Sequence, residues 1–356
     1  MIAVILAGGS GTRFWPLSRK DRPKQLVRLF GQRVMIAQTF ERLARVVSQE
    51  NVYIVCGEHL VERILDAIPE LDPEHLIVEP SARNTAPAIL LASAVIEARH
   101  GADVPVGIFP SDHFIGKPEL FASTVEAASQ VARREDAIVT LGISPTRPET
   151  GYGYILRDVE EDPDEHGSSP VDAFVEKPNV EKALEYLSHG HYFWNAGMFF
   201  FRPMTMKGEF KRQEPLFYEV YNDLVHAYEQ GTFADVLPQR FEQLEKISID
   251  YAIMEGAQEV RVVPSLFPWS DVGHWAALDE VCDANGEGNV IEAERVSLHD
   301  VKDSIFYSEE GSQRRIAAVG LDGMVVVDTR DAVLVMPKDR AQDVRAIVDM
   351  LPDDER

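Results

Sequence analysis

Residues 1–13 read Met1-Ile2-Ala3-Val4-Ile5-Leu6-Ala7-Gly8-Gly9-Ser10-Gly11-Thr12-Arg13, an apolar run that passes directly into a glycine-rich loop. The continuous apolar run is typical of a strand buried on both faces of a sheet. Three glycines in four positions let a backbone approach a ligand closely and turn its amide N–H groups toward phosphate. A P-loop would need Gly-Lys-Ser/Thr and a dinucleotide fingerprint would need glycine at Phe14, so neither template matches. The structural alternative is a tight strand-to-helix connection.

Outward from this stretch, short apolar runs alternate with helical patterns over the first 145 residues. This alternation indicates right-handed crossovers and predicts an α/β fold with a Rossmann-like, mostly parallel mixed sheet covered on both faces. Ligands bind at the carboxyl ends of the strands in such sheets, so residues directly after each strand are candidates for a site. The expected strands lie at 52–55, 76–78, 104–109 and 137–141.

The pattern changes from Gly151 onward. A strand pair is expected at 152–157 and 171–176 around an acidic loop, followed by helices over 204–255 and a strand at 260–263. We place a domain boundary near 284, which gives domains of 1–284 and 285–356. The second is β-rich, with apolar runs at 304–307, 324–327 and 332–336 and a last helical stretch at 340–351.

The composition excludes several classes of partner. The 356 residues include 35 Lys and Arg against 59 Asp and Glu, a formal net charge of −24 that repels nucleic acids and anionic membranes. The apolar stretch at 86–96 is interrupted by Pro87 and Ser93 and is too short to cross a bilayer. Cys56 and Cys282 cannot build a disulfide framework, so we expect a cytoplasmic protein. The net charge and the short apolar stretch together predict no nucleic-acid and no membrane partner.

Positive charge is nevertheless concentrated beside the glycine loop. Residues 1–30 carry a net charge of +5, because only Asp21 offsets six basic residues, which are Arg13, Arg19, Lys20, Arg22, Lys24 and Arg28. We interpret this as cations gathered where a polyphosphate binds, with Arg13 offering a planar fork and Lys24 a compact charge. A solvated basic face is the alternative.

Several motifs match one family in order along essentially the whole chain. They comprise residues 8–19 with Pro23-Lys24-Gln25, then 79–87, 110–113, 151–154, 174–178, 194–199 and 269–273. With these motifs the chain resembles the sugar-nucleotide pyrophosphorylases and, within them, the mannose-1-phosphate guanylyltransferases. The resemblance implies a nucleotidyltransferase domain, a small C-terminal left-handed β-helix-like domain and a homodimer.

The activity that the resemblance implies is the transfer of GMP from GTP to α-D-mannose 1-phosphate with Mg²⁺, which gives GDP-mannose and pyrophosphate. The sugar phosphate is already a charged nucleophile, so the reaction needs no strong general base. Positioning and neutralisation of developing charge are what the protein has to supply. The residues expected to be catalytic are Arg13, Lys24, Asp112, Lys177 and Asp271.

Asp112 and Asp271 are the expected metal ligands. Asp112 follows the strand that ends at Phe109, and two carboxylates together with phosphate oxygens suit Mg²⁺. Alternatively, Asp112 could cap the next helix and Asp271 could be a turn residue. His189 and His191 have no third ligand at useful spacing, so no metal is expected there.

The remaining site residues divide into two sets. In the nucleotide set, the carboxylate of Glu79 is expected to accept hydrogen bonds from the N1–H and N2–H₂ donors of guanine. Asn84 either lines the nucleotide pocket or caps the helix that follows it. In the sugar-phosphate set the Glu-Lys-Pro motif places Lys177 over the phosphate, although the run from Asn195 could instead be a turn. The nucleotide set is Leu6, Ala7, Gly8, Gly9, Ser10, Gly11, Thr12, Arg13, Lys24, Glu79, Arg83 and Asn84. The sugar-phosphate set is Gly151, Glu176, Lys177, Asn195 and Asp271.

Other functions remain open at this point. A sugar nucleotidyltransferase with another nucleotide or sugar preference would share the glycine loop. A glycosyltransferase of related architecture would be expected to show two aspartates flanking one residue, whereas Asp112 stands between Ser111 and His113. A non-catalytic subunit would be expected to lose Arg13, Lys24 or Asp112, and all three are present.

Overall fold

The structure is a computed structural model that describes residues 1–9, 11–352 and 355. The chain divides into two compact units, neither of which is continuous in sequence. Unit 1 consists of Met1–Gly8, Thr39–Ser111 and Ile115–Pro268, and unit 2 of Gly9–Gln38, Asp112–Phe114 and Trp269–Arg356. The domain boundary expected at 284 stays a prediction.

Unit 1 is built on a mixed sheet, whose strands run in the order β3-β2-β1-β4-β9-β6-β10-β8-β7. Strands β3, β2, β1 and β4 pair in parallel, as does β6 with β10. The strands are β1 (Ile2–Leu6), β2 (Val52–Gly57), β3 (Leu76–Glu79), β4 (Val106–Pro110), β6 (Ile138–Ile143), β7 (Tyr154–Arg157), β8 (Ser169–Val175), β9 (Tyr192–Phe201) and β10 (Val260–Pro264). The α/β fold with a mixed sheet is therefore confirmed.

The sheet is less parallel than the sequence indicates because β9 inserts between β4 and β6 and runs antiparallel to both. Strands β7 and β8 also pair antiparallel with their neighbours. The strand β9 contains Asn195, Ala196 and Gly197, so the turn considered for this run is wrong. Its aromatic residues, such as Phe200, are buried in the centre of the sheet.

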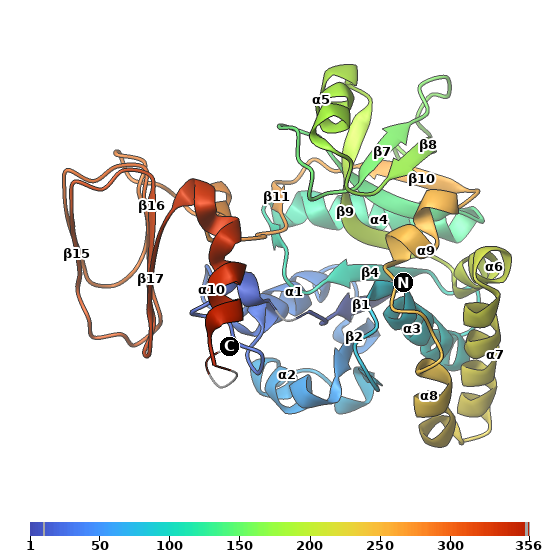
Figure 1. The fold of residues 1–356 in the computed structure, drawn as a ribbon. Helices are drawn as coiled ribbons and strands as arrows, with labels where there is room; N and C mark the ends of the chain where they lie inside the picture. Colours follow the sequence, from blue (N-terminus) through green and yellow to red (C-terminus); the bar gives the residue numbers. More distant parts are fainter. Residues whose placement is uncertain (10, 353–354, 356) are drawn as a thin grey trace. The chain divides into compact units, whose positions relative to one another are not determined.

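Helices cover both faces of this sheet. Side chains alternate along a strand, so Ile108 joins the apolar core formed with α3 and α6–α9, whereas Phe109 packs edge-on against Phe121 of α4. Helices α3, α6, α7 and α8 gather together in Figure 1. The helices are α1 (Met35–Leu43), α2 (Val61–Ala67), α3 (Thr85–His100), α4 (Pro118–Arg134), α5 (Val180–His189), α6 (Pro203–Gln213), α7 (Pro215–Glu229), α8 (Phe233–Phe241) and α9 (Ile249–Ala252).

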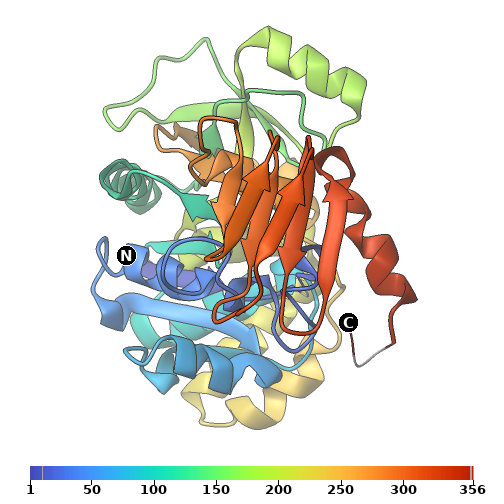
Figure 2. The ribbon, with the colours of Figure 1, turned by 90° about the vertical axis from the view of Figure 1, so that its left-hand side faces the viewer.

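Unit 2 contains a β-helix-like domain made of two small sheets. Strands β12, β14 and β16 pair in parallel and β17 adds antiparallel at the edge, a layer that Figure 2 shows face-on, while β13 pairs in parallel with β15. The strands are β12 (Val290–Glu292), β13 (Val296–His299), β14 (Ile305–Ser308), β15 (Ile316–Val319), β16 (Met324–Asp328) and β17 (Val333–Pro337). The helical stretch expected at the end forms a 3-10 helix η8 (Lys338–Asp343) and α10 (Val344–Met350).

The core of unit 2 joins residues from opposite ends of the chain. Phe14, Trp15 and Leu17 are buried with side chains of β14, β16, β17 and α10. The Phe14 ring lies edge-on to Trp275, at 5.2 Å between centroids, and Trp275 in turn lies 5.1 Å from Tyr307. The segment after the glycine loop is therefore part of the same hydrophobic core as the β-helix.

The other short elements of the chain are β5 (Phe114–Ile115), β11 (Trp269–Ser270) and the 3-10 helices η1 (Thr12–Phe14), η2 (Lys24–Leu26), η3 (Gln49–Asn51), η4 (Glu58–Leu60), η5 (Pro73–His75), η6 (Met254–Gly256) and η7 (Trp275–Glu280). Of the helices that the structure describes, none combines the length and the apolar character needed to cross a bilayer.

Candidate functional site

The glycine loop and Lys24 fit together through an unusually close approach of two backbones. Gly11 has φ of 57°, in the left-handed region, and a Cβ built there would lie 2.4 Å from the backbone nitrogen of Lys24. Only glycine fits such a position. The buried Ser18 hydroxyl donates to the Gly11 carbonyl at 2.6 Å, which fixes the loop from its other side.

Lys24 connects the two predicted metal ligands of unit 2. Its Nζ donates to the Asp112 carboxylate at 2.8 Å, to the Asp112 carbonyl at 2.8 Å and to the Asp271 carbonyl at 2.6 Å. Burial alone would raise the pKa of Asp112, but Lys24, His113 and Arg13 outweigh it and hold that pKa below its usual value. Asp112 is therefore a carboxylate at neutral pH, and it does not cap the following helix, whose N-cap is Lys117.

Arg13 and Asp271 both lie close to Gly273. A Cβ at Gly273 would lie 3.1 Å from the Asp271 carboxylate and 3.5 Å from an Arg13 guanidinium nitrogen. Between them the buried Val272 has φ of 44°, which is strained for a β-branched residue. Such strain costs about 1–3 kcal/mol and is concentrated at functional sites. Unit 2 thus brings Arg13, Lys24, Asp112 and Asp271 into one cluster.

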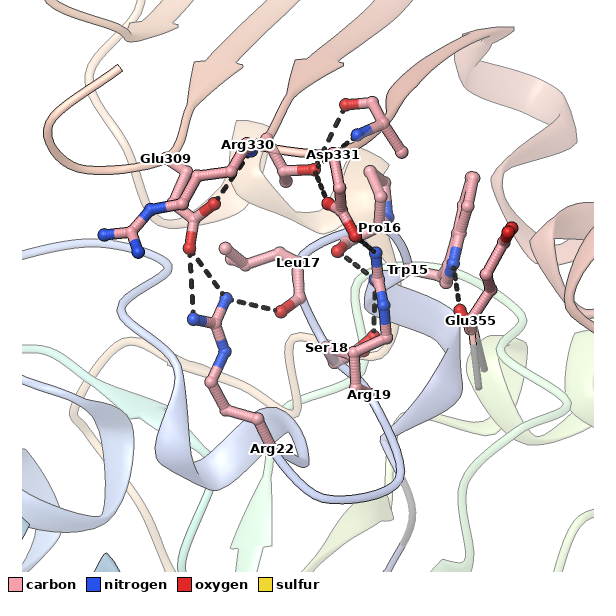
Figure 3. A network of polar contacts seen from close by, with 12 residues as sticks. Trp15, Pro16, Leu17, Ser18, Arg19, Arg22, Glu309, Arg330, Asp331 and Glu355 are labelled. Atoms are coloured by element: carbon pink, nitrogen blue, oxygen red, sulfur yellow. Dashed lines mark hydrogen bonds and ion pairs between the residues drawn. The ribbon is translucent and has the colours of Figure 1, made fainter. Parts of the chain in front are cut away.

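The structure corrects our interpretation of the basic segment. We call residues 11–28 the basic loop. Arg19 pairs with Asp331 at 3.0 Å, Arg22 with Glu309 at 3.0 Å and Arg28 with Glu310 at 3.8 Å. Figure 3 shows Arg19 and Arg22 directed at the β-helix carboxylates. Much of the local +5 is thus neutralised within unit 2, and Arg13 and Lys24 are the cations that lie beside the two predicted metal ligands.

Backbone groups of Leu6 and Ala7, which are predicted to contact the nucleotide, already form hydrogen bonds within unit 1. The Ala7 amide donates to the Val55 carbonyl at 2.8 Å, and the Leu6 carbonyl accepts from the Ser111 amide at 3.3 Å. Gly8 has open space where a Cβ would be, and so does Gly9 of unit 2 with φ of 100°. Thr12 opens η1, and Ser10 lies outside the described residues.

Glu79 is the buried carboxylate at the carboxyl end of β3. Only 7% of its surface is exposed, and burial raises its pKa to about 7. A carboxyl group with this pKa can change protonation state near neutral pH, which is typical of functional positions.

Arg83 and Asn84, which follow Glu79 in the same motif, have structural partners in unit 1. Arg83 donates to the Leu244 carbonyl at 2.7 Å and pairs with the Glu242 carboxylate. Asn84 is the N-cap of α3, because its side chain accepts from the Thr85 amide at 2.8 Å. The cap expected as an alternative for Asn84 is thus confirmed, and both side chains are occupied in this structure.

The sugar-phosphate residues Glu176, Lys177 and Asn195 also cluster in unit 1. Lys177 Nζ pairs with the Glu176 carboxylate, and a Cβ at Gly153 would lie 2.6 Å from that carboxylate and 3.3 Å from the Asn195 Cβ. The Lys177 side chain is 55% exposed and that of Glu176 only 5%. Gly151, with its amide on the Glu149 carboxylate at 3.0 Å, does not appear among these contacts.

Sequence reasoning missed Asp250 in this cluster. The Asn195 amide donates to its carboxylate at 3.0 Å, and Asn195 Oδ1 accepts from the Thr140 hydroxyl at 3.2 Å, so both ends of the amide are fixed. Burial, with Glu176 adding to it, raises the pKa of Asp250 to about 6. Asp250 stands in the first turn of α9, where an aspartate ordinarily complements the helix dipole, so no sequence signal marks it.

His189 and His191 stack edge-on with 5.4 Å between ring centroids. Within the described part of the chain, no group of three or more His, Cys, Asp or Glu side chains is arranged to hold a metal ion.

Known proteins match this chain over its whole length. The nucleotidyl transferase family model matches residues 2–287, and that of a MannoseP isomerase/GMP-like beta-helix domain matches 294–351. A mannose-1-phosphate guanylyltransferase of Escherichia coli is 40% identical over 359 residues, covering 100% of this chain and 75% of the relative. The chain belongs to the mannose-1-phosphate guanylyltransferase family of nucleotidyltransferases.

Further relatives agree with this membership. A mannose-1-phosphate guanylyltransferase of Klebsiella pneumoniae is also 40% identical, with the same coverage of 100% and 75%. A solved structure described as a mannose-1-phosphate geranyltransferase from Thermus thermophilus has a TM-score of 0.87 and 38% identity, covering 98% of both chains. The resemblance seen in the motifs is confirmed, as are the enzyme class and the fold of a nucleotidyltransferase domain with a β-helix-like domain.

Proposed function

We propose that the protein transfers GMP from GTP to α-D-mannose 1-phosphate, with GDP-mannose and pyrophosphate as products. The observation that carries the proposal is that Lys24 Nζ contacts the carboxylate of Asp112 and the carbonyl of Asp271 beside a glycine loop whose Gly11 leaves no room for a side chain. That arrangement suits a triphosphate with a divalent cation. Relatives at 40% identity that are named mannose-1-phosphate guanylyltransferases support the choice of substrates.

In this reaction a phosphate oxygen of mannose 1-phosphate attacks the α-phosphorus of GTP. The bond to the oxygen that bridges to the β-phosphate breaks, and pyrophosphate leaves with the electron pair. Arg13 and Lys24 are proposed to bind the departing phosphates, because a guanidinium and an ammonium neutralise the charge that develops there. The amides of Gly8, Gly9 and Gly11 add hydrogen-bond donors without the bulk of side chains.

Asp112 and Asp271 fit Mg²⁺ in the chemistry of their donors. Both supply the oxygen ligands that this ion prefers, and Asp112 is ionised because cations hold its pKa down. Two carboxylates leave room for phosphate oxygens and waters, as is usual for Mg²⁺ beside a nucleotide. When bound, the ion would neutralise α-phosphate charge.

The cluster around Lys177 is proposed to bind the sugar phosphate. Lys177 supplies an exposed cation for the phosphate, and the buried Glu176 and the Asn195 amide are suited to sugar hydroxyls. Asp250 orients that amide through its hydrogen bond at 3.0 Å. Gly151 contributes backbone groups only.

Glu79 is proposed to select guanine. Ionised, its carboxylate can accept from the N1–H and N2–H₂ donors of guanine, a pair that adenine lacks. A Glu79→Gln variant is expected to lose part of the preference for GTP over ATP. If it keeps the full preference, this role is excluded.

The test is a matrix of nucleoside triphosphates against sugar 1-phosphates with Mg²⁺, measured as pyrophosphate release. The highest kcat/KM is expected for GTP with mannose 1-phosphate, and Asp112→Asn serves as the inactive control. Faster release with another pair would replace the proposed substrates. Release from no pair at all, with transfer of sugar from a sugar nucleotide instead, would favour a glycosyltransferase.

Two further features belong to the proposal. We propose a homodimer formed through the β-helix, because β17 is an edge strand on which Val333 and Val335 are each 56% exposed. Sedimentation of wild type against a Val335→Lys variant tests this, since a lysine on the edge should weaken the dimer. We also propose a cytoplasmic location.

A further inference from the structure

We propose that Glu309 and Asp331 of the β-helix are positioning residues for nucleotide binding, acting through Arg22 and Arg19 of the basic loop. The inference rests on the proposed function, because it concerns the loop that carries Arg13 and Lys24. All of these residues belong to unit 2.

Glu309 holds Arg22 from the β-helix side. Its Oε1 accepts from both guanidinium Nη atoms of Arg22 at 3.0 Å, and its Oε2 accepts from the Arg330 amide at 3.1 Å. The Glu309 side chain is only 12% exposed. Arg22 also donates to the Leu17 carbonyl at 2.8 Å, so one guanidinium joins the β-helix to the basic loop (Figure 3).

Asp331 holds Arg19 in a similar way. The carboxylate accepts from Arg19 at 3.0 Å and from the Thr329 hydroxyl at 3.0 Å. Arg19 donates in turn to the carbonyls of Pro16 and Ser18, and its guanidinium lies 5.4 Å from the Trp15 ring centroid (Figure 3). Each arginine therefore satisfies carbonyls of the basic loop and a carboxylate of the β-helix at once.

The two arginines also fix each other. The amide of Arg19 donates to the carbonyl of Arg22 at 2.9 Å, and the amide of Arg22 donates to the carbonyl of Arg19 at 3.0 Å. This small hairpin stands between Ser18, which binds the Gly11 carbonyl, and Lys24, whose backbone lies against Gly11. A shift of the hairpin must therefore move the glycine loop or Lys24.

The geometry explains why two carboxylates suit this position. Guanidinium groups that bind loop carbonyls alone would keep an unneutralised charge beside the cations of the proposed phosphate site. Glu309 and Asp331 remove that charge and fix direction as well, because charge-assisted hydrogen bonds are strongly oriented. The β-helix thereby helps to place Lys24 through the basic loop.

The test combines Glu309→Gln and Asp331→Asn in a double variant of the full chain. The matched control is Asp322→Asn, since Asp322 is an exposed carboxylate of the same domain that pairs with Lys302 at 3.2 Å. The double variant is expected to raise KM for GTP about tenfold, the size of one charge-assisted hydrogen bond, with little change in KM for mannose 1-phosphate. A variant that combines Glu309→Gln with Asp331→Glu keeps one of the two carboxylates and should recover much of the loss.

A second readout needs no substrate. Amide hydrogen exchange over residues 11–28 should become about tenfold faster in the double variant and remain at the wild-type rate in Asp322→Asn. Equal exchange and equal KM for GTP in the double variant and the control would overturn the inference. Wild-type protein inactive with GTP would refute the proposed function instead, and the exchange result would still decide the role of the carboxylates.

Discussion

Two clusters of a lysine with carboxylates illustrate how position determines charge. In the Lys24 cluster, burial would raise the pKa of Asp112, but Lys24 in direct contact, together with His113 and Arg13, outweighs burial and lowers that pKa. In the Lys177 cluster, the lysine binds Glu176 instead, and burial together with Glu176 raises the pKa of Asp250 to about 6. The carboxyl of Asp112 is therefore held ionised for a cation, whereas that of Asp250 titrates next to an amide that it orients.

The largest effect is expected from breaking the first cluster. Lys24→Ala removes the group that joins Asp112 to Asp271 and a proposed phosphate ligand, so kcat/KM for GTP should fall by about 10³-fold or more. Steady-state pyrophosphate release measures this. Lys20→Ala, an exposed lysine of the same loop, is the matched control and should stay within a few-fold of wild type. Similar losses in both variants would contradict a specific role for Lys24.

Breaking the second cluster should have a smaller effect, and it should change KM for mannose 1-phosphate instead of kcat/KM for GTP. Lys177→Ala removes an exposed cation proposed for the sugar phosphate, so KM for mannose 1-phosphate should rise by about 10- to 100-fold. The KM for GTP should change little. Lys182→Ala, an exposed lysine on α5, is the control. An equal rise of both KM values in Lys177→Ala would argue against a sugar-phosphate contact.

The raised pKa of Asp250 predicts that this carboxyl makes the free energy of unfolding depend on pH. Its folded-state pKa of about 6 lies above the usual 3.8, so the folded state binds the proton more tightly than the unfolded state does. The stabilising contribution is complete below pH 3.8 and is lost as the pH rises through 6. Asp250→Asn should therefore increase the free energy of unfolding by about 2 kcal/mol at pH 8 and leave it nearly unchanged at pH 4.

Urea denaturation at both pH values measures this difference. Asp66→Asn, at an exposed position on α2, should leave the free energy of unfolding as in wild type at each pH. A destabilised Asp250→Asn at pH 8 would show that the ionised carboxylate is worth more to the fold than its burial costs.

Glu79 provides a third case, a buried carboxyl whose pKa is raised by burial alone to about 7. If the ionised form accepts from guanine, KM for GTP should rise a few-fold as the pH falls from 8 to 6, because Glu79 becomes protonated. Glu79→Gln should abolish that part of the pH dependence. If the pH dependence of KM for GTP is the same in Glu79→Gln as in the wild type, Glu79 does not bind guanine.

The sequence predicted local structure well where burial alone dictates it. The strands β2, β3, β4 and β6 are uniform apolar runs between turn residues, and each lies within two residues of its expected position. The position of β9 was not predictable from the sequence. Its aromatic residues indicate that the strand is buried, but its pairing with β4 and β6 depends on the arrangement of the whole sheet.

The candidate site shows the same limit in terms of charge. Lys24 and Asp112 were found through motifs, and the structure brings them together. The count of +5 could not reveal that Arg19 and Arg22 pair with carboxylates that are 312 and 287 residues away in sequence. A local net charge is summed over residues that are adjacent in sequence, whereas ion pairs form between residues that are adjacent in the folded structure.

Unit 2 is assembled from segments that are made early and late during synthesis on the ribosome. Trp15 donates to the carbonyl of Glu355, a residue that is made 340 positions later. At about 5–20 residues per second, roughly 20 to 70 s pass before that partner exists. During this time Phe14, Trp15 and Leu17 lack the β-helix side of their core. The nascent chain therefore carries an exposed aromatic segment that a chaperone could bind, and the basic loop gains this contact only after residue 355 has been made.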